Sequence, residues 1–111
     1  MAEKLDIVVD AIDGKKGKDI LALDFEGSSS VCDYTVICTG SSNRNIQAIA
    51  DGINEKLGEN GMKRLSIEGY DEGKWILIDC GDILVNIFDR TTREEYRLEV
   101  LWNDAKEVLR K

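Results

Sequence analysis

Two apolar runs in the second half of the chain constrain its fold more than any other feature. They span Trp75–Cys80 and Ile83–Phe88 and are separated only by Gly81 and Asp82. Short runs rich in isoleucine, leucine and valine indicate β-strands, and a two-residue link that begins with glycine suits a type II′ turn. The sequence therefore predicts a β-hairpin at this place.

Three other segments are predicted to be strands. Asp33–Thr39 is nearly all apolar in its middle, as expected for a central strand that is covered on both faces. A short strand is expected at about Leu65–Gly69, before a turn at Tyr70–Gly73. The first strand, Ile20–Glu26, follows a strict alternation, which places Leu21, Leu23 and Phe25 on one face and Ile20, Ala22, Asp24 and Glu26 on the other.

Three segments have helical spacing. The first covers Glu3–Asp13, and the second follows a turn and cap at Gly40–Asn43. The third is predicted to begin at a cap on Thr91 or Thr92 and to continue to about Leu109. Their apolar stripes are Leu5, Val8, Val9 and Ile12, then Ile46, Ile49, Ala50, Ile53 and Leu57, then Leu98, Leu101, Ala105 and Val108. The order α-β-β-α-β-β-β-α predicts an α/β fold, with a mixed sheet of about five strands flanked by helices.

The length of 111 residues is that of one domain, expected to span residues 1–111. The 22 acidic and 15 basic side chains give a formal net charge of -7. This balance argues against tight binding to a phosphate backbone, because such affinity comes mainly from lysine and arginine. It suits a basic protein partner, although the same charge could serve only to keep the protein in solution.

Cysteine and histidine usage argues against a metal site. The three cysteines, Cys32, Cys38 and Cys80, contain no CxxC pair, and buried reduced thiols are predicted. The chain has no histidine, the commonest general base and a frequent metal ligand. No secretory signal or membrane-spanning run is visible, so a cytoplasmic location is the default expectation.

Two groups of residues could carry chemistry. Gly40, Ser41 and Ser42 lie between a strand and a helix, where free amides could hold a phosphate, but the spaced glycines and lysine of known phosphate loops are missing. A similar element opens nucleotidyltransferase domains, where a close acidic pair follows, whereas here only Asp51 does. A plain turn and cap is favoured, with a nucleotidyltransferase-like enzyme as the alternative.

Carboxylates and aromatic rings form the second group. Asp79 and Asp82 flank the hairpin turn, but strand alternation does not bring them to a common point, so a solvated face is favoured. Most of the aromatic residues lie in the last part of the chain: Tyr70, Trp75, Phe88, Tyr96 and Trp102. Such rings can fill a core or, beside acidic side chains, form the hot spot of an interface. Composition alone leaves both readings open.

Five short segments, in the same order, resemble the Iojap-like family of ribosomal silencing factors. The resemblance is collinear from about Asp19 to Asp104. Each segment is weak alone, but five in the right order are hard to obtain by chance. The matching segments are Cys32–Gly40, Gln47–Asp51, Glu68–Tyr70, Trp75–Asp82 and Arg93–Trp102.

The resemblance implies an α/β domain that is related in topology to nucleotidyltransferases but has no catalytic activity and needs no cofactor. It implies a translational repressor that binds the large ribosomal subunit, chiefly through ribosomal protein L-fourteen. By occupying the face that meets the small subunit, such a protein blocks subunit joining when nutrients are scarce. Homodimers of the free protein are also implied. A basic ribosomal protein would attract this acidic chain.

The residues expected to face this partner come from the matching segments. Trp75 is expected to anchor the contact, and Asp79 and Asp82 to pair with basic residues. Family sequences usually carry histidine where Asn86 stands, and they differ at Asp89–Thr92 as well. Asn86 keeps a hydrogen-bonding group without titration. The full candidate set is Tyr70, Trp75, Asp79, Asp82, Asn86, Phe88, Arg93 and Tyr96.

Overall fold

A computed structural model describes residues 3–28, 32–64 and 66–111. The first half of the chain forms α1 (Glu3–Gly14), β1 (Lys18–Asp24), β2 (Tyr34–Thr39) and α2 (Asn43–Glu59). The second half forms β3 (Ser66–Glu68), β4 (Trp75–Asp79), β5 (Ile83–Phe88), α3 (Arg90–Tyr96), α4 (Leu98–Leu101) and β6 (Lys106–Arg110). Leu65, the first residue of the strand predicted at Leu65–Gly69, lies outside the described residues.

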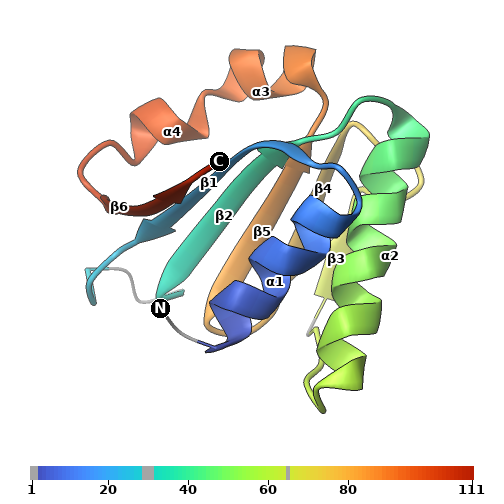
Figure 1. Cartoon of the computed structure of the whole chain (residues 1–111). Coiled ribbons are helices and arrows are strands. Elements are labelled where there is room, and N and C mark those ends of the chain that lie inside the picture. Colours follow the sequence, from blue (N-terminus) through green and yellow to red (C-terminus); the bar gives the residue numbers. More distant parts are fainter. Residues whose placement is uncertain (1–2, 29–31, 65) are drawn as a thin grey trace.

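The strands form one mixed sheet in the order β3-β4-β5-β2-β1-β6 (Figure 1). β2 and β5 are parallel at its centre, and the other neighbouring strands are antiparallel. The predicted mixed α/β class is therefore confirmed, with six strands in the described sheet instead of about five.

The predicted hairpin is present between β4 and β5. The Cys80 amide donates to the Ile83 carbonyl at 2.8 Å, which closes a two-residue turn. Gly81 has a φ of 91°, the positive value that glycine was predicted to supply at the first turn position. The hairpin pairs Asp79 with Leu84 and Trp75 with Phe88, and so fixes which side chains share a face.

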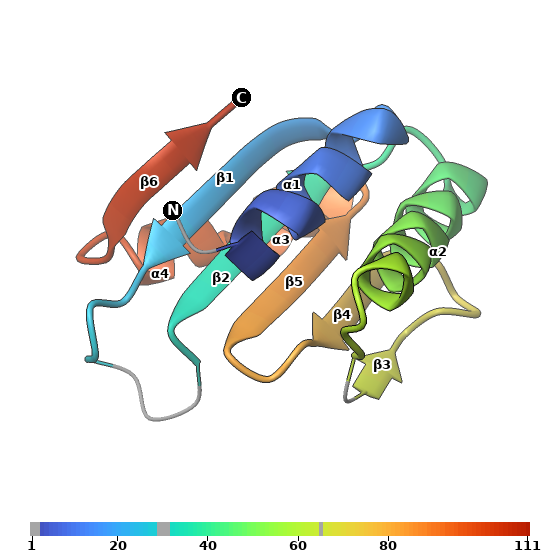
Figure 2. The same cartoon turned by 60° about the horizontal axis from the view of Figure 1, so that its bottom comes forward.

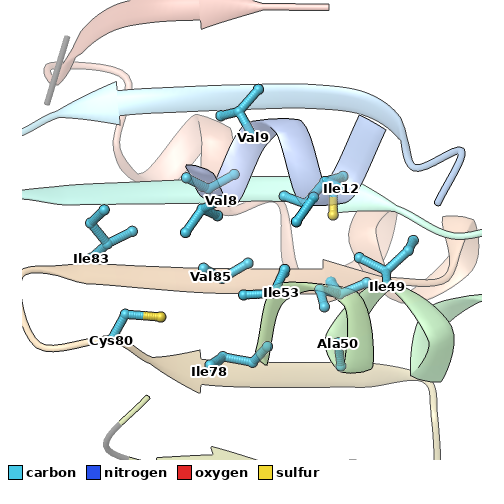
Figure 3. Packing of buried hydrophobic residues seen from close by; sticks show 14 of the residues in the cluster. Val8, Val9, Ile12, Ile49, Ala50, Ile53, Ile78, Cys80, Ile83 and Val85 are labelled. Atoms are coloured by element: carbon cyan, nitrogen blue, oxygen red, sulfur yellow. The ribbon is translucent and has the colours of Figure 1, made fainter. Parts of the chain in front are cut away.

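Both long helices cover the same face of the sheet. Figure 2 shows α1 and α2 side by side in front of the strands, with α3 and α4 behind them. In Figure 3, Val8 and Ile12 of α1 and Ile53 of α2 gather with Val85 of the sheet. These four side chains are fully buried. The main core thus lies between the predicted helical stripes and this face.

A smaller core lies on the opposite face. Leu21 and Leu23 of β1, Ile37 of β2 and Phe88 of β5 form a buried cluster with Leu98 of α4. Ile20 and Ala22 belong to the main cluster, so the predicted alternation is confirmed from Ile20 to Leu23. The strand ends at Asp24, and Phe25 and Glu26 of the predicted strand lie beyond it. With apolar clusters on both faces, the apolar middle of β2 is explained.

The predicted final helix is broken at Arg97 and is wrong beyond Leu101. Arg97 takes a left-handed conformation with a φ of 48°, which ends α3, and α4 ends at Leu101. Lys106–Arg110 then pairs with β1 as an antiparallel strand. Val108 and Leu109 both pack against the main core. Strand pairing and burial on the edge of β1 outweigh the helical spacing of these residues, because propensity is a weak prior beside tertiary contacts.

The predicted cap of this segment is also corrected. Asp89, instead of Thr91 or Thr92, is the N-cap of α3, and its carboxylate accepts a hydrogen bond from the Thr92 amide at 2.7 Å. Aspartate serves as well as threonine at this position, so the sequence offered several equivalent candidates.

All three cysteines are buried, as predicted. Burial raises the pKa of Cys38 to about 12 and that of Cys80 to about 11. Because the thiolate is the reactive form, both should be protonated at pH 8 and should react with a disulfide reagent more than about tenfold more slowly than in urea. Peptide mapping after timed labelling measures both rates. Equal rates in native and unfolded protein would contradict the burial of these thiols.

Candidate partner-binding surface

The sheet face opposite α1 and α2 carries most of the predicted site residues. Along β4, Trp75, Leu77 and Asp79 alternate with the buried Ile76 and Ile78, so they point away from the main core. Leu84 of β5 lies beside Asp79, and both are partly exposed. We call Trp75, Leu77, Asp79, Leu84 and the adjacent Tyr96 of α3 the β4–β5 surface.

Three aromatic rings form the end of this surface nearest α3. The Trp75 ring stacks on Phe88 with centroids 5.0 Å apart and an interplanar angle of 30°. Tyr96 lies against Trp75 with centroids 4.7 Å apart and is 53% exposed. Phe88 is fully buried, so it supports the Trp75 ring from the interior of the protein. The predicted grouping of Trp75, Phe88 and Tyr96 is therefore present in the structure.

Asn86 fixes the orientation of the Trp75 ring. Its side chain is buried, and its Oδ1 accepts a hydrogen bond from Trp75 Nε1 at 3.0 Å. Its Nδ2 donates to Thr35 Oγ1 at 3.3 Å, and the Thr35 hydroxyl donates to the Leu84 carbonyl at 3.2 Å. Because the indole nitrogen can only donate, the acceptor oxygen of Asn86 must face it. Asn86 thus acts on the surface by holding Trp75.

Replacing Asn86 with alanine should lower the free energy of unfolding by about 1–3 kcal/mol. The change leaves the part-buried indole N–H of Trp75 without an acceptor and removes the donor to Thr35 Oγ1, and an unsatisfied donor costs more than the lost bond itself. Urea unfolding followed by tryptophan fluorescence measures the effect. Asn54→Ala is a matched control because Asn54 is exposed on α2. Equal stability of the two variants would show that this network contributes nothing.

The hairpin carboxylates have partners within the chain. Asp79 Oδ1 accepts the Gly81 amide at 2.8 Å, which stabilises the turn. Asp82 pairs with Lys4 Nζ at 2.9 Å, and the same ammonium group donates to the Cys80 carbonyl at 3.0 Å. Asp82 therefore joins the hairpin to the start of α1. Both carboxylates remain partly exposed.

Arg93 connects four elements. Its Nε pairs with Glu99 of α4 at 2.9 Å, while its Nη1 donates to the Asp19 carbonyl at 2.7 Å and to the Thr39 hydroxyl at 2.9 Å. Only 11% of the side chain is exposed. Arg93 therefore holds α3 and α4 on β1 and β2, and through α3 it positions Tyr96.

Tyr70 lies apart from the other aromatic residues of the predicted set. Its hydroxyl donates to both oxygens of Asp51 on α2 at 3.0 Å, and this hydrogen bond raises the pKa of Tyr70. Its ring packs against the main core, which is on the α1–α2 side of the sheet. The structure therefore separates Tyr70 from Trp75.

A groove at the edge of the aromatic cluster contains groups that sequence analysis missed. It has a volume of about 300 Å³, and Glu72, Lys74 and Thr92 line it together with Trp75 and Tyr96. Glu95 completes the lining. Glu72 and Glu95 are exposed and form no ion pair within the described part of the chain. Glu95 is the sequence neighbour of Tyr96, and this adjacency is the local signal that could have indicated that Glu95 lies beside the aromatic cluster.

The Gly40–Ser42 segment is a turn and helix cap, as favoured from the sequence. Ser42 Oγ accepts the Asn45 amide at 3.0 Å, and the Ser41 amide donates to Asn45 Oδ1 at 2.9 Å. A Cβ atom at Gly40 would lie 2.4 Å from the Ile46 side chain, so glycine is needed for close packing there. Within residues 3–28, 32–64 and 66–111, no group of three or more histidine, cysteine or carboxylate residues could hold a metal ion.

A family model described as "Ribosomal silencing factor during starvation" matches residues 1–111. The chain belongs to the ribosomal silencing factor family. A silencing factor of Bacillus subtilis is 48% identical over 101 residues, which cover 91% of this chain and 86% of that protein. The names of the family model and of this relative both refer to silencing of the ribosome, which is a regulatory role.

Two further comparisons agree with the family assignment. The crystal structure of a Chromobacterium violaceum protein matches with a TM-score of 0.89 and 34% identity, covering 93% of this chain and 88% of that one. A mouse protein named "Mitochondrial assembly of ribosomal large subunit protein 1" is 28% identical over 101 residues, covering 88% of this chain and 44% of that protein. In the described parts of the chain, no helix is long and apolar enough to cross a membrane.

Proposed function

We propose that this protein is a translational repressor that binds the large ribosomal subunit, chiefly through ribosomal protein L-fourteen. Membership of the silencing factor family over residues 1–111 carries this proposal. The name of the mouse relative, which refers to assembly of a ribosomal large subunit, supports the choice of subunit. We further propose that the chain acts as a single domain in the cytoplasm, without a cofactor.

The β4–β5 surface has the chemistry that a basic protein partner would need. Trp75 and Tyr96 offer aromatic faces, and Glu72 and Glu95, whose carboxylates form no ion pair with the described residues, line the groove beside this surface. A lysine or arginine side chain is attracted both to an aromatic face and to a carboxylate. The net charge of -7 would favour encounter with such a partner.

Repression would follow from the volume that the bound protein occupies. The molecule measures 35 × 34 × 23 Å along its principal axes. A body of this size on the face of the large subunit that meets the small subunit would exclude the small subunit, and no chemical step is required. Slower translation under nutrient limitation would be the result. A homodimer of the free protein that uses the same surface would compete with this binding.

Sucrose-gradient sedimentation of purified subunits tests the proposal. Added protein should comigrate with the large subunit and reduce the fraction of joined ribosomes. If large subunits carry none of it, or join small subunits normally while carrying it, the proposal is wrong. A pull-down with purified L-fourteen tests the partner separately: binding to whole subunits without binding to L-fourteen would point to another ribosomal component.

A further inference from the structure

Two exposed aliphatic side chains on α4 lie outside both cores. Among the described residues, the exposed large apolar side chains are Tyr96, Val100 and Leu101, which fall within one short stretch of the chain. Val100 is 61% exposed and Leu101 is 69% exposed. Single exposed apolar residues are common on protein surfaces, but a concentration of them in one segment indicates an interaction site. We call Val100 and Leu101 the α4 patch.

The fold anchors the α4 patch on both sides without burying it. Leu98 is buried in the smaller core, and Trp102 packs against the same cluster. The Trp102 ring also meets Phe25 edge to face, with ring centroids 5.6 Å apart. A surface that is already ordered loses less conformational entropy on binding. Polar side chains at positions 100 and 101 would serve the fold equally well, so their apolar character indicates a partner.

The α4 patch continues the β4–β5 surface. α4 follows α3 directly, and both helices lie on the side of the sheet away from α1 and α2 (Figure 2). Tyr96 belongs to the β4–β5 surface, and the chain from Tyr96 to Leu101 can span at most about 18 Å. A standard protein interface covers about 800 Å² of each partner, which is a patch about 30 Å across. One partner can therefore contact Trp75, Tyr96 and the α4 patch at once.

The charge around the α4 patch favours a basic partner. The segment from Glu94 to Asp104 has three exposed carboxylates, those of Glu94, Glu95 and Asp104, and one exposed guanidinium group, that of Arg97. Lysine and arginine side chains of a partner would be attracted to such a rim, whereas an RNA backbone would be repelled. A second copy of this chain would bring carboxylates close to like carboxylates, which is unfavourable.

We propose that the basic ribosomal protein that binds the β4–β5 surface also covers the α4 patch, with Val100 and Leu101 packed against aliphatic side chains of that partner. This inference rests on the proposed function, because it adds a second part to the same interface. Removing two aliphatic side chains from water would strengthen the complex through the hydrophobic effect. The charged rim would fix the orientation of the partner and speed its encounter with the surface.

A polar double variant tests the α4 patch. Val100→Ser with Leu101→Ser should lower the affinity for purified L-fourteen and for purified large subunits at least about tenfold, because the complex loses two buried aliphatic groups. Both positions are exposed, so urea unfolding should show unchanged stability. Leu101→Ser alone serves if the double variant does not fold. The control, Asn54→Ser with Gly58→Ser, changes two exposed positions of α2 on the other side of the sheet and should bind as the wild type does.

The outcomes separate this inference from the proposed function. If the wild type binds neither L-fourteen nor large subunits, the proposed function fails and the inference fails with it. If the wild type binds and the polar double variant binds equally tightly, only the inference fails. Weaker binding to large subunits without a matching loss towards L-fourteen would assign the patch to another ribosomal component and overturn the inference. Sedimentation velocity of the free protein covers the remaining case: loss of self-association with unchanged affinity for L-fourteen would assign the patch to a second copy, which also overturns it.

Discussion

Replacing Trp75 with alanine should weaken binding to the large ribosomal subunit by roughly 2 kcal/mol or more, about thirtyfold. Trp75 stacks on Phe88, contacts Tyr96 and borders the groove that contains Glu72 and Glu95. Truncation removes the largest ring of the proposed contact. It also removes the ring against which Tyr96 packs. The dissociation constant can be measured by cosedimentation of labelled protein with purified large subunits.

Two further variants make this measurement specific. Trp75→Phe keeps a ring beside Phe88 and Tyr96 but loses the hydrogen bond to Asn86, so its affinity should lie between those of the wild type and Trp75→Ala. Tyr70→Phe changes an aromatic residue on the other side of the sheet and should leave the affinity unchanged. Unchanged binding of a folded Trp75→Ala protein would remove Trp75 from the binding surface.

Replacing Arg93 with alanine should lower the free energy of unfolding by about 2–3 kcal/mol. The guanidinium group is largely buried, and its loss leaves the Thr39 hydroxyl, the Asp19 carbonyl and Glu99 without their common partner. Glu99 is one-third exposed, so water can solvate part of its charge and limit the loss. Urea unfolding measures the difference.

The neighbouring Arg90 supplies the control for this experiment. Arg90→Ala removes an exposed arginine from the start of α3 and should change stability by less than about 0.5 kcal/mol. The Arg93→Ala variant should also bind large subunits more weakly, because α3 carries Tyr96. Equal stability of the two arginine variants would show that Arg93 does not hold α3 and α4 in place.

The elements with strong local signals could be predicted from the sequence. The hairpin follows from its apolar runs and from Gly81, and the start of α2 follows from Ser42 before an apolar stripe. The end of the chain could not be predicted in this way. Nothing local indicates that Arg97 adopts a left-handed conformation, and the pairing of β6 with β1 depends on residues that lie far apart in the sequence.

The part of the candidate surface that lies on β4 could be predicted, because alternation along a strand defines which side chains share a face. Trp75 and Asp79 share a face in β4, and the same rule could have added Leu77. The positions of Tyr70 and Arg93 depend instead on contacts across the fold, with Asp51 and with Asp19 and Thr39. Side chains of these types look alike in a sequence whether they face a partner or hold the chain's own elements together.

The pairing of β6 with β1 has a consequence for how the chain folds. Until Lys106–Arg110 docks, the backbone groups along the outer edge of β1 have no strand to bond to. An open edge of this kind can recruit a strand of another molecule. The pairing joins segments more than eighty positions apart, and contacts at such separation form late because long loops must close first. Aggregation during refolding should therefore be most severe before this last strand is in place.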